Sequence, residues 1–188
     1  MPAIAFEAYH GTSDTGAKGI LQAGYNNSQK PHEWLGHGVY FFVDGISDPI
    51  ENAHEWARAQ AWDAENGKNK YHEFAVLKST VTIDEDRFID ITTTDGLKIF
   101  NDAKELLFNK IEKNFRGRFV KQDQHNCILF NFMVNYFEAQ AVKHHLYIKS
   151  IRERKLSLRL NVPNTTVLCV RSKDYCSNTI VVGKGEIK

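Results

Sequence analysis

Two short segments near the N-terminus combine ring side chains with glycines. The first is Tyr9-His10-Gly11-Thr12, and the second is Leu35-Gly36-His37-Gly38-Val39-Tyr40-Phe41-Phe42. Each lies at an apolar run of residues that favour β-strands, and glycines permit a ligand to approach the backbone. A histidine and a tyrosine that two neighbouring strands present in this way can line the same pocket. We therefore expect His10 and Tyr40 to belong to one binding site.

The order and spacing of these residues resemble the NAD-binding core of the ADP-ribosyltransferases. The chain is closer to the His-Tyr-Glu branch, which holds the poly-ADP-ribose polymerases and the diphtheria-type toxins. A glycine-stopped helix follows the first segment, and a helix containing Ala-His-Glu-Trp-Ala follows the second, as in that family. The resemblance covers about the first sixty residues well and the remainder only in its run of strands. It implies NAD as co-substrate and an α+β fold with a split antiparallel β-sheet core and flanking helices.

The resemblance also implies a role for each residue in breaking the bond between ribose and nicotinamide. His10 would contact the ribose hydroxyls of the adenosine half, the backbone of Gly11 would pair with the nicotinamide amide, and Tyr40 would stack on the nicotinamide. Thr12 is a further polar neighbour, and Trp56 is the aromatic residue that the following helix offers. Each residue also has a structural interpretation, because His-Gly-Thr is a common turn and buried aromatic rings usually pack in cores.

The third residue of the family pattern is a glutamate, sometimes a glutamine, at the start of a late strand. It stabilises the oxocarbenium-like transition state and can help activate the acceptor. The expected strand 165–171 begins without an acid. Glu153 is the first candidate for this role and Glu138 the second, although either can be an ordinary solvated charge. Relatives that lack the acid transfer a single ADP-ribose or are inactive.

Composition predicts one compact domain over residues 1–188, with 42% hydrophobic and 25% charged residues. The net charge of +1 argues against a purely electrostatic polyanion binder. Three cysteines form neither a metal spacing nor an even disulfide set, and no histidine pair has the flanking ligands of a zinc site, so no metal is expected. The chain shows no signal peptide and no membrane-length apolar run, which predicts a cytoplasmic protein without a membrane partner.

The pattern of elements predicts mixed helices and strands with mainly antiparallel pairing. Residues 26–33 are polar and contain proline, so we expect a loop over the pocket. The apolar segment Cys127–Phe137 is open to either a buried helix or a strand. Leu156, Leu158, Leu160 and Val162 alternate with polar residues, as in a strand. The other expected strands span residues 3–9, 34–43, 71–83, 141–148, 165–171 and 179–182. A first expected helix follows a cap at Thr12, Ser13 or Asp14 and stops at Gly24, and two more span residues 50–66 and 94–115.

A stand-alone transferase of this size is similar to toxins of bacterial toxin–antitoxin or phage-defence systems, for which an antitoxin protein would be a partner. The basic segments Lys110–Lys121 and Lys149–Lys155, with Arg159, favour a nucleic-acid acceptor, and single-stranded RNA in particular. Tyr136, Phe137 and Tyr147 offer rings for stacking on bases. The same charges can also be ordinary solvated ones, balanced by 23 acids. The expectation is a mono-ADP-ribosyltransferase acting on RNA, with transfer to protein, or an inactive NAD- or ADP-ribose-binding module, as alternatives.

Overall fold

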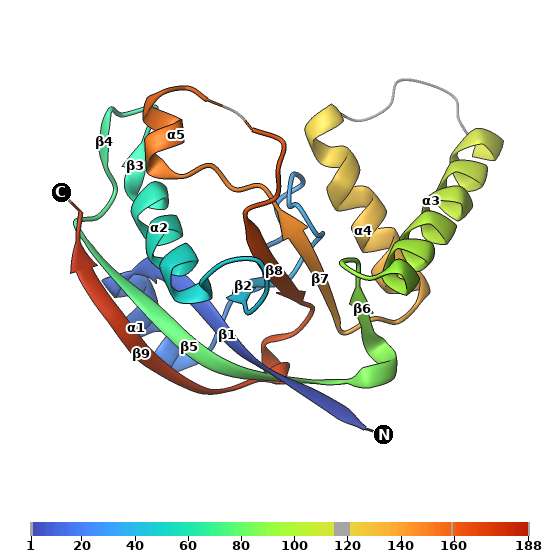
Figure 1. Ribbon diagram of the computed structural model, residues 1–188, viewed down its shortest axis with the longest axis horizontal. Helices are drawn as coiled ribbons and strands as arrows, with labels where there is room; N and C mark the ends of the chain where they lie inside the picture. Colours follow the sequence, from blue (N-terminus) through green and yellow to red (C-terminus); the bar gives the residue numbers. More distant parts are fainter. Residues whose placement is uncertain (1, 115–120, 159, 188) are drawn as a thin grey trace.

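The strands of the computed structural model, which describes residues 2–114, 121–158 and 160–187, form one large sheet and one small hairpin. They are β1 (Ala3–Ser13), β2 (Val39–Val43), β3 (Trp62–Asp63), β4 (Lys68–Asn69), β5 (Glu73–Asp84), β6 (Phe88–Asp90), β7 (Ala141–Leu146), β8 (Thr165–Val170) and β9 (Cys176–Glu186). The large sheet has the order β6-β7-β8-β2-β1-β5-β9, while β3 pairs with β4 (Figure 1). Neighbouring strands are antiparallel except β6 and β7, which are parallel. The expected α+β class with mainly antiparallel pairing is confirmed.

Helices cover both faces of this sheet. They are α1 (Asp14–Ala23), α2 (Pro49–Ala61), α3 (Thr94–Asn114), α4 (His125–Tyr136) and α5 (Ile151–Lys155), with the short 3-10 helices η1 (Glu85–Arg87), η2 (Gln122–Gln124) and η3 (Lys173–Tyr175). One apolar cluster joins α1 to one face through Ala8 and Ala17, and another joins α2 and α4 to the other face through Tyr9 and Met133. Alternate residues of β1 therefore serve two separate cores.

Helices α1 and α2 both begin with side-chain caps. The Ser13 hydroxyl accepts a hydrogen bond from the Gly16 N–H at the start of α1, and the Asp48 carboxylate accepts two at the start of α2. Pro49 occupies the first turn of α2, where its missing N–H has no helical partner to lose. These caps fix the point at which α1 departs from the end of β1 and the point at which α2 begins after β2. They therefore fix the positions of the helical side chains relative to the two strands.

The sheet splits between β1 and β2. These strands pair only at Ala8 with Val43 and at Tyr9 with Phe42. Beyond that point β1 continues along β5 as far as Ser13, while β2 continues along β8 to Val39. Facing edges of β1 and β2 therefore separate, and side chains from both strands can enter the opening between them.

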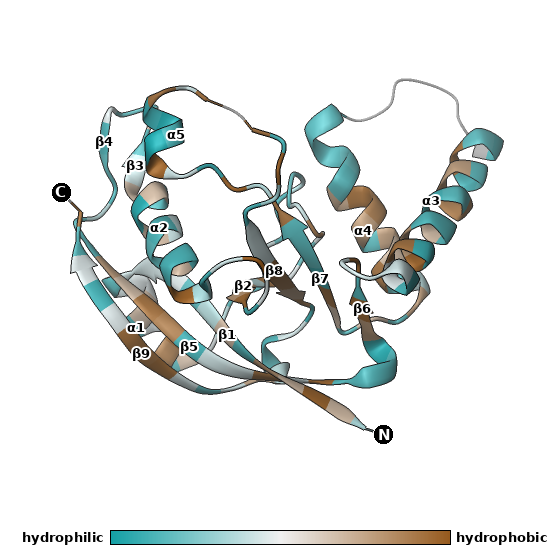
Figure 2. Ribbon diagram, viewed as in Figure 1, coloured by the Kyte–Doolittle hydropathy of each residue, from teal (hydrophilic) through white to brown (hydrophobic). Residues whose placement is uncertain are grey.

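One expected helix is too long and one expected strand is absent from the described residues. The helix expected over residues 50–66 ends at Ala61, because the chain turns back through the β3–β4 hairpin, where Gly67 adopts a positive φ of 62°. The alternating segment Leu156–Val162 is no strand in its described residues. Its apolar side chains are exposed, between 49% and 74%. The ribbon between α5 and β8 carries brown, hydrophobic stretches in Figure 2.

The apolar segment that periodicity left open is helical as α4, and its buried residues include Phe130 and Met133. A continuous apolar run is compatible with a helix or a strand. Packing against the sheet and α3, which are distant in sequence, determines that this segment is helical. Residues 26–33 form the expected loop, and the expected strand at 141–148 is present as β7. Among the described residues, no helix combines the length and the apolar character that crossing a bilayer requires.

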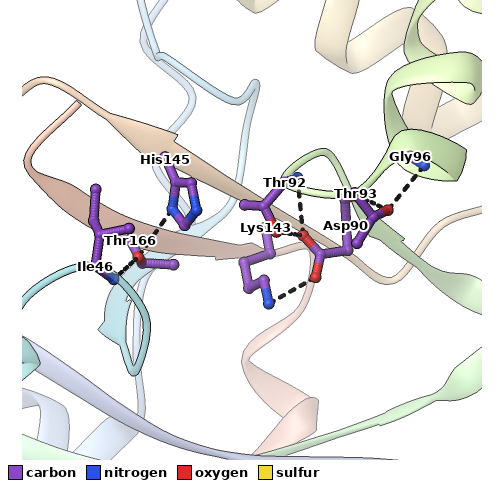
Figure 3. Close-up of polar contacts among 8 residues, drawn as sticks. All are labelled: Ile46, Asp90, Thr92, Thr93, Gly96, Lys143, His145 and Thr166. Atoms are coloured by element: carbon purple, nitrogen blue, oxygen red, sulfur yellow. Dashed lines mark hydrogen bonds and ion pairs between the residues drawn. The ribbon is translucent and has the colours of Figure 1, made fainter. Parts of the chain in front are cut away.

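A polar network fixes the end of the sheet from which α3 departs (Figure 3). The Lys143 ammonium on β7 lies 2.6 Å from the Asp90 carboxylate on β6, which also accepts hydrogen bonds from Thr92. Burial raises the pKa of Asp90, but these contacts outweigh it and hold that pKa below its usual value. Thr93 then accepts a hydrogen bond from the Gly96 N–H in the first turn of α3. The α3–α4 pair is thus anchored to the sheet by paired charge.

Candidate functional site

A cavity of about 540 Å³ opens where β1 and β2 separate. This volume is within the range of small-molecule sites. β1 contributes His10, Gly11 and Thr12, and β2 contributes Tyr40. The structure therefore brings together the two segments that sequence analysis singled out. The other lining residues include Asn26, Ser28, Lys30, His32, Glu33, Trp34, Trp56, Gln60, Lys70, Tyr71, Ile148 and Val167.

His10 lies across the split of the sheet. Its Nδ1 is 2.9 Å from the carbonyl oxygen of Tyr40, so the imidazole bridges the strands where their backbones no longer pair. This contact requires the proton on Nδ1, which leaves Nε2 as an acceptor in the neutral ring. The rings of Tyr25 and Phe41 contact the imidazole edge-on. Burial lowers the pKa of His10, and the hydrogen bond to Tyr40 opposes that shift only in part.

The hydroxyl of Tyr40 is fully engaged with the backbone of the preceding loop. It accepts a hydrogen bond from the Leu35 N–H at 2.8 Å and donates one to the Gly36 carbonyl at 2.6 Å. Burial raises the pKa of this phenol, so the group stays protonated. Tyr40 can thus offer its ring to a ligand but not its hydroxyl as an acid or base.

Two tryptophans extend the aromatic wall beside Tyr40. The Trp34 ring lies edge-on to Tyr40, with centroids 6.4 Å apart, and edge-on to Trp56 at 5.4 Å. Trp56, the aromatic residue expected from α2, lines the cavity and also packs against the core. Trp34 was not predicted as a site residue, although it begins the expected strand 34–43 directly after the expected loop, which was the available signal.

Gly11 lies beyond the last β1–β2 pair, so one edge of β1 is open to the cavity at this residue. A Cβ here would lie 1.9 Å from the carbonyl oxygen of Ala53 on α2. The glycine therefore permits the close approach of α2 to β1, in addition to leaving the backbone accessible. Thr12 also lines the cavity, one position farther along β1.

Residues 24–38, which we call the strap, close one side of the cavity. Ser28 and Gly38 exchange backbone hydrogen bonds of 2.8 and 3.1 Å across its base. The Arg171 guanidinium donates to the carbonyl oxygens of Leu35, at 2.7 Å, and His37. The Asn131 side chain accepts from the His37 N–H at 2.7 Å. The strap is thus held by Arg171, which follows β8, and by Asn131 of α4, and these contacts position Trp34.

Charged side chains of both signs line the cavity. Lys30 and Lys70 supply cations, as a pyrophosphate requires. Glu33 is the acidic side chain that the described residues place on the wall, and it accepts a hydrogen bond from the Ser28 hydroxyl. Glu33 could not be predicted from the sequence, because it lies in an irregular loop with no periodic pattern.

The two glutamates expected as the third site residue lie away from this wall. Glu153 belongs to the capping box of α5, where Ser150 donates to it from both N–H and hydroxyl at 2.8 Å. These bonds lower the pKa of Glu153, with the backbone bond from Ser150 as the largest cause. Glu138 is exposed and lies 4.0 Å from Arg87. The late strand β8 instead places Val167 on the cavity wall.

The basic segments expected to contact a nucleic acid lie apart. Arg152, Arg154 and Lys155 are exposed on α5, which packs beside α2, whereas α3 lies at the other end of the molecule against α4 and β6 (Figure 1). Arg116, Arg118 and Arg159 fall outside the described residues. Within the described ranges, no three His, Cys, Asp or Glu side chains gather as a metal site.

No protein-family model matches the chain. The chain is similar to an uncharacterized protein of Methanocaldococcus jannaschii, with 28% identity over 109 residues. The matched region is 57% of this chain and 47% of the relative, so the chain spans about half the length of that protein.

Proposed function

We propose that this protein is an NAD-dependent mono-ADP-ribosyltransferase, which transfers ADP-ribose to a macromolecular acceptor and releases nicotinamide. The observation that carries the proposal is the split between β1 and β2, at which His10, Gly11 and Tyr40 meet in one cavity. These are the residues on which the resemblance to the ADP-ribosyltransferases rests. We further propose that the sheet is the split antiparallel core of an ADP-ribosyltransferase.

The side chains of the cavity suit the parts of NAD. The aromatic wall of Tyr40, Trp34 and Trp56 offers faces and edges for the nicotinamide ring. The open backbone edge at Gly11 can pair with the carboxamide, and the neutral His10 imidazole can accept a hydrogen bond from a ribose hydroxyl. Lys30 and Lys70 can neutralise the pyrophosphate.

In the proposed reaction the bond between the ribose carbon and the nicotinamide nitrogen breaks, and its electron pair leaves with nicotinamide. The acceptor nucleophile forms the new bond to that ribose carbon and gives up a proton. A carboxylate near the ribose would stabilise the positive charge that develops there and could take the proton.

Glu33 meets this requirement better than the two glutamates predicted from the sequence. It lines the cavity from the strap, whereas Glu153 caps α5 and Glu138 pairs with Arg87. We assign the carboxylate role to Glu33 within this proposal. The roles predicted for Glu153 and Glu138 remain predictions, and one assay compares all three.

A non-catalytic NAD- or ADP-ribose-binding module is the second candidate. It is favoured by Val167, an apolar residue, on the cavity wall of the late strand β8, where the family pattern carries an acid near the strand's start. Such a module would bind NAD in the same cavity without releasing nicotinamide. A toxin role, an antitoxin partner and a cytoplasmic location also remain predictions.

Nicotinamide release and ADP-ribose transfer test the proposal when NAD carries separate labels in the nicotinamide and the adenylate. Purified protein should release nicotinamide and label one of three acceptor pools: RNA, DNA or protein. Glu33→Gln should lower release by roughly 100-fold or more, while Glu153→Gln and Glu138→Gln serve as matched controls. NAD binding without release from the unaltered protein would favour the binding module, and absence of NAD binding would overturn both candidates.

A further inference from the structure

A second cavity of about 640 Å³ lies on the other side of the strap. Successive residues of the strap face opposite cavities. Asn27 and His37 line the second cavity, whereas their neighbours Asn26, Ser28 and Gly38 line the first cavity. Side-chain amides dominate this wall. They come from the strap and from α4, and they are Asn27, Gln29, Asn131 and Asn135.

Two of these amides hold the wall together and two are available to a ligand. Asn27 donates to the Arg171 carbonyl at 2.6 Å, and Asn131 accepts from the His37 N–H. Gln29 and Asn135 are exposed, and their side-chain amides form no hydrogen bond among the described residues. Each presents a donor and an acceptor side by side, the arrangement that pairs with the edge of a nucleobase.

An aromatic stack at the C-terminal end of α4 neighbours Asn135 of this cavity wall. The rings of Phe132 and Tyr136 are stacked with centroids 5.9 Å apart, and Tyr136 meets Phe137 edge-on at 5.0 Å. Tyr136 is 57% exposed and Phe137 is 37% exposed, although both are large rings. Phe132 precedes Asn135 by three positions, so the stack and the amide neighbour each other on the helix surface.

Cationic side chains lie near the stack and the cavity. The Lys110 ammonium of α3 lies 5.8 Å from the centre of the Phe132 ring. Arg87 lies 4.0 Å from Glu138, which also lines the cavity and balances one cation. In the same cavity wall, the Nε of Arg171 is buried with no partner in the described part of the chain.

We infer that the amide-lined cavity and the aromatic stack bind single-stranded nucleic acid, with an unpaired base in the cavity and a neighbouring base on Tyr136. Exposed aromatic rings next to unbonded amides and a few cations suit unpaired bases, whereas a duplex hides its base faces. This inference rests on the proposed function for its meaning, since it names the acceptor. The strap then separates acceptor and NAD by one thickness of chain.

Binding of fluorescent 12-nucleotide RNA, measured by polarisation without NAD, tests the inference, with DNA of the same sequence and the matching duplex as further arms. Single strands should bind more tightly than the duplex. Tyr136→Ala should weaken binding about 5- to 100-fold, which corresponds to the loss of one base–aromatic contact. Asn135→Ala should weaken it less, and Trp62→Ala, which removes a 55% exposed ring elsewhere, should not change it. An RNA preference over DNA would identify the acceptor as RNA, and the reverse as DNA.

Several outcomes overturn the inference. They are equal affinity for duplex and single strand, unchanged binding by Tyr136→Ala and Asn135→Ala, and a change in oligomeric state on Tyr136→Ala, which would mark the stack as a protein interface. Thermal melting confirms that each variant is folded. Because NAD is absent, binding of single strands without nicotinamide release would overturn the proposed function alone. Nicotinamide release without binding of either single-stranded RNA or single-stranded DNA would overturn this inference alone.

Discussion

The hydroxyl and the ring of Tyr40 have different roles. Its hydroxyl holds the strap through Leu35 and Gly36, and its ring faces the cavity. We expect Tyr40→Phe to lower the free energy of unfolding by about 1–3 kcal/mol, because the buried Leu35 N–H loses its acceptor, while NAD binding persists.

A larger change at the same residue separates stacking from stability. Tyr40→Leu should weaken NAD binding by about 1–3 kcal/mol, by analogy with base–aromatic contacts. Isothermal titration with NAD and denaturant unfolding of both variants measure the two effects. Equal NAD affinity in the leucine variant and the unaltered protein would show that the ring does not contact the ligand.

His10 makes stability depend on pH. Burial lowers its folded-state pKa below the unfolded value, so the unfolded chain binds the proton more readily. The stability that the neutral ring contributes is therefore complete above the unfolded pKa of about 6.5 and decreases as pH falls below it. One proton changes the free energy of unfolding by at most about 1.4 kcal/mol per pH unit.

Urea unfolding between pH 7.5 and 5 checks this expectation. His10→Gln keeps a neutral donor for the Tyr40 carbonyl and should flatten the profile. Burial also lowers the pKa of His144, so His144→Gln is the matched variant that reports the second contribution. A profile that His10→Gln leaves as steep as before would remove His10 as the source.

At the scale of elements, the contact of α2 with β1 depends on Gly11. A methyl group there would lie 1.9 Å from the Ala53 carbonyl oxygen, which belongs to helix backbone and cannot turn away. Gly11→Ala should destabilise the protein by about 1–3 kcal/mol or more. Gly19→Ala is the matched control, since nothing lies within 4 Å of its added methyl and the helix gains propensity of about 0.5–1 kcal/mol. Thermal unfolding of both variants should give shifts of opposite sign.

The strap depends on Arg171, which donates to two of its carbonyl oxygens. Arg171→Gln should release the strap, because hydrogen bonds from a charged donor contribute about 1.5–3 kcal/mol. Limited proteolysis should then cut within residues 24–38, and NAD affinity should fall roughly 10-fold. Lys173→Gln, which removes an exposed donor to the Ala23 carbonyl, is the control and should leave both measurements unchanged. A strap that stays intact in the Arg171 variant would contradict this account.

Local sequence patterns predicted the elements whose cause is local. Capping residues and Gly24 predicted where α1 begins and ends. The β-prone run around Tyr40 predicted β2, although this strand starts only at Val39. The Leu156–Val162 segment shows the limit of this reasoning. Its alternation equals that of a strand, but a strand requires a free sheet edge at the right place, and β7 already pairs with both β6 and β8.

The site was predictable where its residues lie on regular strands. His10 and Tyr40 sit on adjacent strands, so pairing brings them together. Glu33 and Trp34 reach the cavity only because Arg171 and Asn131, more than 90 positions away, fold the strap over it. Contacts between residues so far apart in the sequence cannot be predicted from local patterns. In α5 the opposite happened, because a residue with the expected sequence position has a purely local role. Glu153 matched the expected order along the chain but serves to cap its own helix.

At the scale of the whole molecule, the split divides the sheet into β6-β7-β8-β2 and β1-β5-β9, and the backbones of these two parts pair at two positions of β1 and β2. A ligand that contacts Gly11 on one part and Tyr40 on the other bridges both parts. Its binding energy should therefore appear as stability of the entire domain and as slower amide exchange in β1 and β2 together.

Thermal unfolding with NAD measures this coupling. A ligand at 100 times its dissociation constant stabilises the folded state by about 2.7 kcal/mol, which for a domain of this size raises Tm by roughly 5–10 °C. Nicotinamide alone contacts fewer groups and should raise Tm less at the same concentration. Tyr40→Leu should reduce the NAD shift because it lowers affinity, whereas Trp62→Ala, outside the cavity, should retain it. A full NAD shift in Tyr40→Leu, or slower amide exchange confined to β1, would place NAD outside the split and contradict the assignment of this cavity.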